Sequence, residues 1–92
     1  MLHSVLQVIP RKDFKVYVYF NTGEVKLFDM NHLLNKGVFK QISNKKDFIS
    51  KCTVLNHTLA WDIKGKFNPF ECIDIDPETI FNSGKLVKDP LE

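Results

Sequence analysis

The chain has 92 residues, 43% of them hydrophobic and 12% aromatic, with a formal net charge of +2. Length and apolar content are typical of one small domain and exclude a disordered chain. No apolar run approaches the roughly 18 residues of a membrane span, and the first residues lack the basic start and apolar stretch of a signal peptide. We therefore expect one cytoplasmic domain, residues 1–92, without membrane contact.

Three strands are predicted at the start of the chain. Residues 4–9 alternate in character up to Pro10, and residues 15–20 are β-branched and aromatic throughout. Residues 25–28 are predicted to form a third strand, which runs back alongside the second after a short turn. Gly23 is the natural left-handed residue of that turn, so a hairpin is expected here.

Two short helices are predicted next. Asp29 can cap a helix over residues 30–35, and Asn44 can cap a second one. In the second helix, Phe48 and Ile49 are expected to point inward. Both helices should then cover one face of the sheet.

A second hairpin is predicted from residues 52–55 and 58–61, which end at Trp61. The two residues between them, Asn56 and His57, tolerate left-handed backbone better than most. The chain then enters a loop around Gly65 before its last strand.

The last predicted strand, residues 72–75, is followed directly by residues that are typical of the start of a helix. Asp76 can accept a hydrogen bond from the first helical turn, and Pro77 has no N–H to leave unpaired. Gly84 should end this helix, and residues 84–92 are expected to be frayed. The whole pattern predicts the α+β class: a mainly antiparallel sheet of two hairpins plus an N-terminal strand, short helices between the hairpins, and a C-terminal helix.

The cysteines and histidines form no recognisable site. Cys52 and Cys72 lack the paired spacing of zinc ligands. Asp29 and His32 are the nearest approach to a metal or proton-relay pair, but capping explains Asp29 and surface exposure explains His32. We expect no metal and no cofactor.

Three carboxylates recur at two-residue spacing near the C-terminal helix. Asp74 and Asp76 share a strand face, but the helix rotates Glu78 away, so a convergent catalytic cluster is not expected. There is also no glycine-rich phosphate loop and no convincing Ser-His-Asp set. The sequence therefore indicates no catalytic residues and a protein that is not an enzyme.

Charge is distributed unevenly along the chain. Residues 11–51 carry nine Lys or Arg against four Asp or Glu, and residues 52–92 carry four against seven. The lysines of the helical middle of the chain could contact phosphates, but Arg11 is the only arginine, so the composition argues against sequence-specific nucleic-acid binding. These lysines are Lys36, Lys40, Lys45, Lys46 and Lys51.

Four aromatic residues are candidate partner-binding positions. Phe67 and Phe70 fall in a loop where no strand pattern needs them, although the loop could also fold down and bury them. Tyr17 and Tyr19 would lie on an adhesive edge if their strand were unpaired on one side. A protein partner or a homo-oligomer formed through a sheet edge is therefore expected; a central strand would remove the edge argument.

A series of motifs runs through nearly the whole chain in a fixed order. They are Tyr19-Phe20-Asn21-Thr22-Gly23-Glu24, Phe28-Asp29 before Leu33-Leu34, Gly37-Val38-Phe39, Phe48, Trp61, and Asp74-Ile75-Asp76-Pro77-Glu78 before Ile80-Phe81. In this order they resemble the small bacterial domain-of-unknown-function family 2442. The chain departs from the family in a longer loop between Trp61 and Asp74, and in Phe81 where Tyr is common.

The resemblance implies a context rather than a reaction. Members of the family are regarded as antitoxins that pair with a small toxin from a neighbouring gene, and the family has no agreed catalytic residues. The matching positions Gly23, Asp29, Trp61, Asp76 and Pro77 all have turn, cap or core explanations. The expected function is an antitoxin that binds its cognate toxin; the alternative is a regulator that binds a ligand or nucleic acid.

Overall fold

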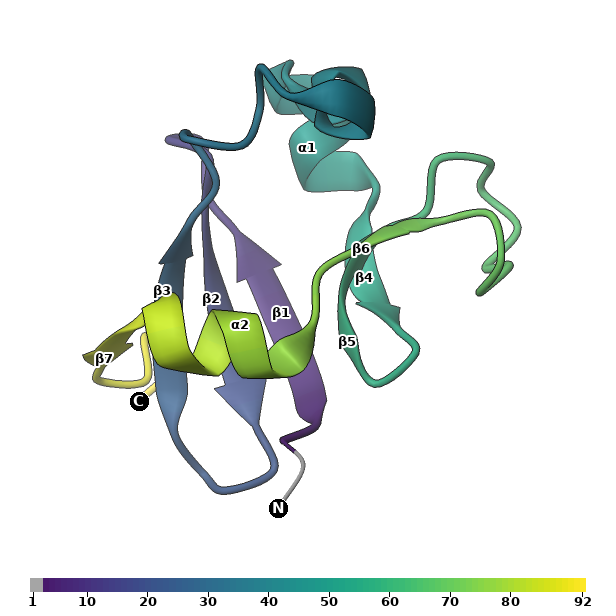
Figure 1. The fold of residues 1–92 in the computed structure, drawn as a ribbon. Coiled ribbons are helices and arrows are strands. Elements are labelled where there is room, and N and C mark those ends of the chain that lie inside the picture. The colour runs from purple at the N-terminus through teal and green to yellow at the C-terminus, as the bar shows by residue number, and fades with distance from the viewer. Residues whose placement is uncertain (1–2) are drawn as a thin grey trace.

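The computed structural model describes residues 3–92, which form two antiparallel sheets and a few short helices (Figure 1). The elements in chain order are β1 (Val5–Pro10), β2 (Lys15–Phe20), β3 (Val25–Asp29), the 3₁₀ helix η1 (Gly37–Ile42), α1 (Lys45–Ser50), β4 (Cys52–Leu55), β5 (Thr58–Trp61), β6 (Ile73–Asp74), α2 (Pro77–Ser83) and β7 (Lys85–Val87). The predicted α+β class is confirmed, including its C-terminal helix.

The two predicted hairpins are both present, but they lie in different sheets. The first belongs to a four-stranded sheet of order β1-β2-β3-β7, and the second to a three-stranded sheet of order β4-β5-β6. Gly23 has a φ of +92° in the first turn, and Asn56 and His57 have φ of +55° and +61° in the second. The sheets meet beside β1, where the Val5 N–H donates to the His57 carbonyl at 2.8 Å.

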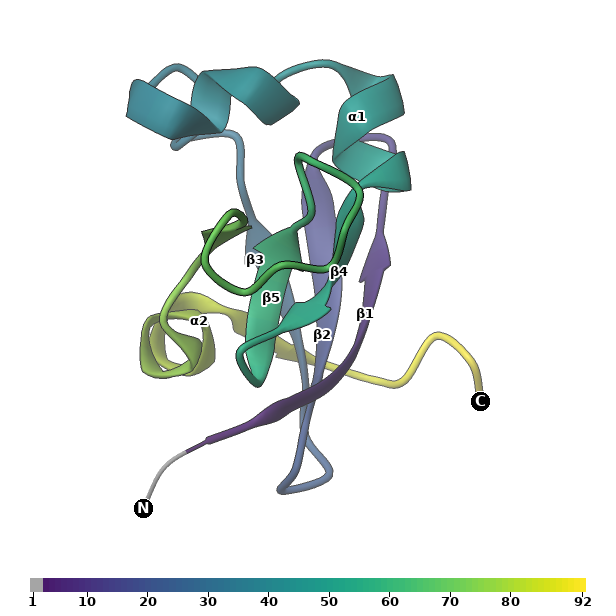
Figure 2. The same cartoon turned by 90° about the vertical axis from the view of Figure 1, so that its right-hand side faces the viewer.

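The core lies between the two sheets and α2. On β2, alternate residues point inward, so that Val16, Val18 and Phe20 are buried. They belong to one apolar cluster with Trp61 of β5 and Ile80 of α2. Figure 2 shows α2 on one side of the four-stranded sheet and the C-terminal tail on the other. The tail therefore crosses the face that β2 turns away from the core.

The helix predicted over residues 30–35 is absent, and that prediction is wrong. This segment makes successive turns, with the Leu33 N–H donating to the Met30 carbonyl at 2.9 Å. Asp29 does cap the segment, but its carboxylate accepts from the Asn31 N–H at 2.9 Å and closes a local turn. A second bond of the same kind joins the Lys36 N–H to the Leu33 carbonyl at 3.0 Å, and bonds between residues three apart close turns rather than an α-helix.

Of the two helices predicted to cover one face of the sheet, only α1 is present, and it lies at one end of the molecule together with η1, which was not predicted (Figure 1). Asn44 caps α1, accepting from the Asp47 N–H at 2.9 Å. Phe48 is buried, but Ile49 is 38% exposed, which contradicts its predicted inward position. Successive residues of a helix point about 100° apart, so when only a narrow face of α1 is buried, Phe48 and its neighbour Ile49 cannot both point inward. Within residues 3–92, no helix has the length and apolar character needed to cross a membrane.

The C-terminal segment is ordered rather than frayed at residues 85–87, which form β7 and pair with β3. The preceding Gly84 ends α2 as predicted. A Cβ at Gly84 would lie 2.8 Å from the Ile80 carbonyl oxygen and 2.9 Å from the Lys26 Cβ. The absence of a side chain there lets the chain pass close to β3 and add a strand to the sheet.

Candidate functional site

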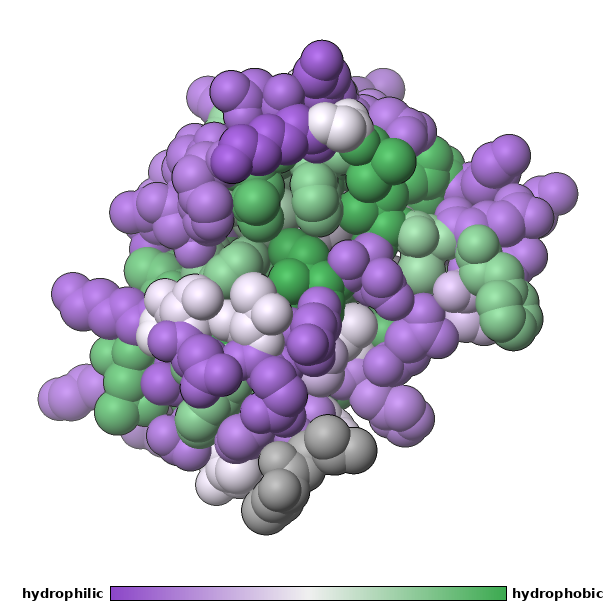
Figure 3. All heavy atoms as spheres, in the orientation of Figure 1, coloured by the Kyte–Doolittle hydropathy of each residue, from purple (hydrophilic) through white to green (hydrophobic). Residues whose placement is uncertain are grey.

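The loop between β5 and β6, residues 62–72, carries the most exposed aromatic side chains among the described residues. Phe67 is 63% exposed and Phe70 is 94% exposed. Figure 1 shows that this loop extends away from the two sheets. In Figure 3, the surface over the loop shows apolar atoms surrounded by hydrophilic ones. The alternative that the loop folds down over the sheet is therefore not what the structure shows.

Local hydrogen bonds hold the loop backbone in place. The Asp62 carboxylate accepts from the Phe67 N–H at 3.0 Å, and the Asn68 side chain accepts from the Phe70 N–H at 2.9 Å. Phe67 has a φ of +50°, a left-handed conformation that a non-glycine residue adopts at a cost. The Phe67 ring is thus presented by a backbone held in an unfavourable conformation, and the backbone at Phe70 is held by its hydrogen bond to Asn68.

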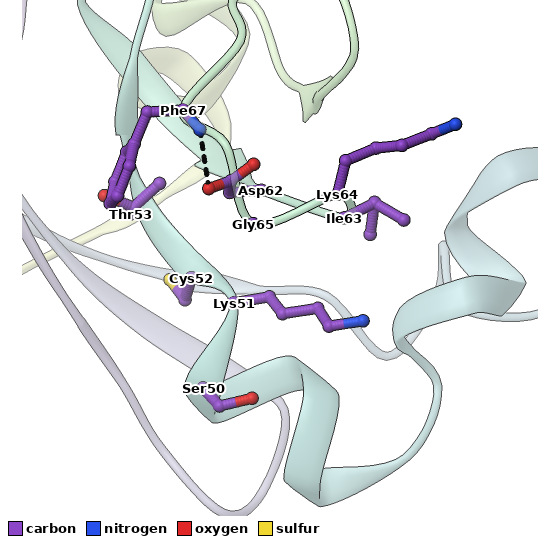
Figure 4. A pocket seen from close by; sticks show the side chains of 9 residues that line it. All are labelled: Ser50, Lys51, Cys52, Thr53, Asp62, Ile63, Lys64, Gly65 and Phe67. Atoms are coloured by element: carbon purple, nitrogen blue, oxygen red, sulfur yellow. Dashed lines mark hydrogen bonds between the residues drawn. The ribbon is translucent and has the colours of Figure 1, made fainter.

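A pocket of about 510 Å³ lies between this loop and the start of β4 (Figure 4). Its walls include Cys52 and Thr53 from β4, and Ile63 and Phe67 from the loop. Asp62 also lines it and is buried, at 6% exposure. Ser50, Lys51 and Lys64 line it as well, so the pocket combines apolar surface with hydroxyl groups, one carboxylate and two ammonium groups.

Asp62 is a site residue that the sequence predictions missed. It directly follows β5, in which Thr58 to Trp61 are all buried, so the inward position of the next residue could have been suspected. An acidic residue at that place is unusual, because carboxylates are rarely buried without a partner.

Tyr17 and Tyr19 do not lie on a sheet edge, because β2 is paired with β1 on one side and β3 on the other. Their side chains point to the face of β2 opposite Val16 and Val18. The Arg11 guanidinium lies 5.5 Å from the centre of the Tyr17 ring. The edge argument from these two residues therefore fails.

Tyr19 is engaged by the C-terminal tail. Its hydroxyl donates to the Asp89 carboxylate at 2.5 Å. Burial, and then this hydrogen bond to a negative group, raise the pKa of Tyr19 to about 12. Tyr19 lines a groove with Val25 and Val87, away from the pocket beside Phe67. The four predicted partner-binding residues thus lie in two separate places.

The remaining predicted positions have structural contacts. Trp61 is fully buried, and its indole N–H donates to the Phe48 carbonyl at 2.9 Å. The Asp76 side chain accepts from the Glu78 N–H at 3.2 Å at the start of α2, whose first residue is Pro77. These contacts are those of core packing and helix capping.

The described cysteine and histidine side chains form no reactive or metal-binding site. Burial raises the pKa of Cys52 to about 12, and burial with the nearby Asp74 charge raises that of Cys72, so neither thiol is activated as a nucleophile. The His3 ring stacks on the Phe81 ring with centroids 3.7 Å apart. Its Nδ1 is hydrogen-bonded to the Glu78 carboxylate at 2.8 Å. Within residues 3–92, no three His, Cys, Asp or Glu side chains gather as metal ligands would.

Comparisons with curated proteins and with solved structures found no match. A family model does match most of the chain, and it covers both hairpins, the 62–72 loop and α2. This agrees with the resemblance noted from the order of motifs. The family is described as a protein of unknown function, DUF2442, its model matches residues 5–85, and the chain belongs to this family.

Proposed function

We propose that this chain is a non-enzymatic protein-binding module, the antitoxin of a bacterial toxin–antitoxin pair that acts in the cytoplasm. One observation carries the binding role: Phe67 and Phe70 are exposed on a loop whose backbone is held by hydrogen bonds. The antitoxin role is supported by the family resemblance, because relatives are regarded as antitoxins.

The loop has the properties of a binding anchor rather than of a packing element. Two exposed rings contribute little to folding, but each would release much water when covered by a partner. A loop already held in its conformation loses little entropy when it binds. Aromatic anchors of this kind supply most of the energy of many protein interfaces.

Co-expression with the product of the adjacent gene and affinity purification of the complex would test the proposal. We expect a complex that is weakened by the double variant Phe67→Ala, Phe70→Ala. Leu6→Ala is the matched control, because Leu6 is also an exposed apolar side chain, at 66%, but lies on β1. Absence of any complex, or equal binding by the double variant, would contradict the proposal.

A nucleic-acid-binding regulator is the second candidate, favoured by the basic end of the molecule. Lys36, Lys40, Lys45 and Lys46 are all exposed and belong to or border η1 and α1, which lie together (Figure 1). Binding through these lysines would weaken steeply with salt. Fluorescence anisotropy with duplex DNA at low salt tests this, and a flat titration curve would remove the candidate.

A further inference from the structure

The start of the 62–72 loop is anchored by its first residue. Asp62 is buried, and its Oδ2 accepts from the Phe67 N–H at 3.0 Å. The other oxygen, Oδ1, accepts no hydrogen bond from any group of residues 3–92. The Asp62 contact holds the backbone at Phe67, but the loop continues beyond it to residue 72, so this contact does not by itself fix the position of Phe70.

The end of the loop is held by a side chain from another part of the three-stranded sheet. The Asn56 amide nitrogen, Nδ2, donates to the Pro69 carbonyl at 3.1 Å and to the Asp74 carboxylate at 3.0 Å. A side-chain amide nitrogen carries two N–H groups, so these two acceptors use both of them. We call this pair of hydrogen bonds the Asn56 anchor. It joins the loop and the strand β6 to the turn between β4 and β5, which lies below the loop in Figure 1.

The turn that carries Asn56 is tightly closed. It consists of Asn56 and His57, with φ of +55° and +61°, between the antiparallel strands β4 and β5. Two-residue turns with positive φ at both positions match the twist of the strands that they join. On its other side, β5 pairs with β6, which ends at Asp74. The donor and the Asp74 acceptor therefore belong to the same sheet, and the Pro69 carbonyl is held against that sheet.

Phe70 directly follows Pro69 in the chain, and its own ring does not hold the loop in place. The ring is 94% exposed, so it gains little from packing. The Phe70 N–H donates to the Asn68 side chain at 2.9 Å, but this bond closes a turn inside the loop and moves with it. The Asn56 anchor instead joins the loop to the sheet at the residue before Phe70. Its second bond goes to a charged carboxylate, and hydrogen bonds to charged groups are among the stronger ones.

We infer that Asn56 is a positioning residue of the partner-binding loop: its anchor fixes the backbone beside Phe70, so that the ring has a defined place before a partner arrives. The importance of this for binding rests on the proposed function; the anchoring of the loop does not. A side chain already held in place loses less freedom on binding than a mobile one. The anchor also gives Asp74, whose side chain is exposed on β6, a structural role.

The anchor is tested in the free protein with Asn56→Gly, which removes the amide and keeps a residue that adopts a positive φ easily. His57→Gly is the matched control, because it changes the neighbouring residue of the same turn, which also has a positive φ and is exposed. We expect the NMR order parameter of the Phe70 N–H to remain near about 0.85 in the wild type and in His57→Gly, and to fall to about 0.6 or below in Asn56→Gly. Equal order parameters in the three proteins would overturn the inference.

Thermal melting of both variants checks that they fold. If Asn56→Gly does not fold, Asn56→Asp replaces it, because aspartate also tolerates a positive φ but its carboxylate has no N–H to donate. The affinity of each folded variant for the product of the adjacent gene is then compared by titration calorimetry. We expect a loss of about threefold to tenfold in the Asn56 variant and none in His57→Gly.

The outcomes separate the inference from the proposed function. A mobile Phe70 with a weaker complex supports the positioning role. A mobile Phe70 with an unchanged affinity overturns that role, because the ring would then bind equally well without the anchor. An unchanged order parameter overturns the inference but leaves the proposed function. If the wild type forms no complex, the proposed function fails, and a fall in the order parameter of Asn56→Gly still supports the anchoring of the loop.

Discussion

The aromatic residues of β5 and of the loop that follows it have opposite environments. Trp61 is fully buried at the end of β5, with its ring centre 5.4 Å from that of Phe48. Phe67, six positions later, and Phe70 are mostly exposed. Aromatic side chains are thus packed in the core at the end of β5 and exposed to solvent in the loop that follows it. The exposed rings of the loop are therefore the residues on which the proposed binding function rests.

The backbone shows the same contrast. In the turn between β2 and β3, the positive φ of +92° falls on Gly23, which adopts it without strain. In the 62–72 loop, a positive φ of +50° falls on Phe67. Glycine at this position would relieve the φ but would also remove the exposed ring, so the two turns differ in the side chain that the left-handed residue carries.

Truncation of an aromatic ring should give the largest difference in stability between β5 and the loop that follows it. We expect Trp61→Ala to lower the free energy of unfolding by about 3–5 kcal/mol, because a large cavity forms and the Phe48 carbonyl loses its donor. Phe70→Ala should change it by less than about 0.5 kcal/mol. Urea denaturation measures both, and comparable losses would mean that the loop ring is part of the core.

A side chain at Gly84 should have the next largest effect. Gly84→Ala places a Cβ 2.8 Å from the Ile80 carbonyl oxygen, so α2 or β3 has to shift, at about 1–3 kcal/mol. Gly23→Ala has open space around it and should cost only about 1 kcal/mol through its φ. Faster amide exchange at residues 85–87 in Gly84→Ala alone would locate the damage in β7. Equal exchange in the two variants would show that close packing at Gly84 is unimportant.

The outer face of the four-stranded sheet gives a smaller effect that depends on pH. The pKa of Tyr19 is raised to about 12 from the ordinary value of 10.0, by burial and by Asp89. Its contribution to stability is fully present below pH 10 and is lost as pH rises to about 12, because the unfolded state loses the proton first. Urea denaturation between pH 9 and about 12 should show this loss, and Tyr19→Phe should remove that part of it. An identical pH profile in the variant would contradict the Tyr19–Asp89 contact.

The smallest expected change in stability is that of Phe67→Gly. Relief of the positive φ, about 1 kcal/mol, nearly offsets the greater freedom of glycine in the unfolded chain, about 0.5–1 kcal/mol. Phe14→Gly is the matched control, because Phe14 also has a positive φ, of +64°, but its ring packs 5.1 Å from that of Phe48. This control should lose about 2 kcal/mol or more. Equal losses in urea denaturation would mean that Phe67 also packs in the core.

The candidate site was predictable only in part. Phe67 and Phe70 stood out because no strand pattern required them, and their exposure agrees with that reasoning. The pocket did not stand out, since it depends on β4 lying against the loop and on the burial of Asp62. The edge argument for Tyr17 and Tyr19 required an unpaired strand, and this condition is not met because β2 is central; strand order cannot be read from one strand alone.

What the sequence determined by itself is the set of features closed within a few residues. The turn at Gly23, the hairpin at Asn56 and the caps at Asn44 and Asp76 each depend on hydrogen bonds or φ preferences of near neighbours. Tertiary structure decided the separation of the hairpins into two sheets, the addition of β7, and the unpaired oxygen of Asp62. These depend on which distant segments become adjacent, and burial and strand pairing are properties of that arrangement rather than of any local pattern.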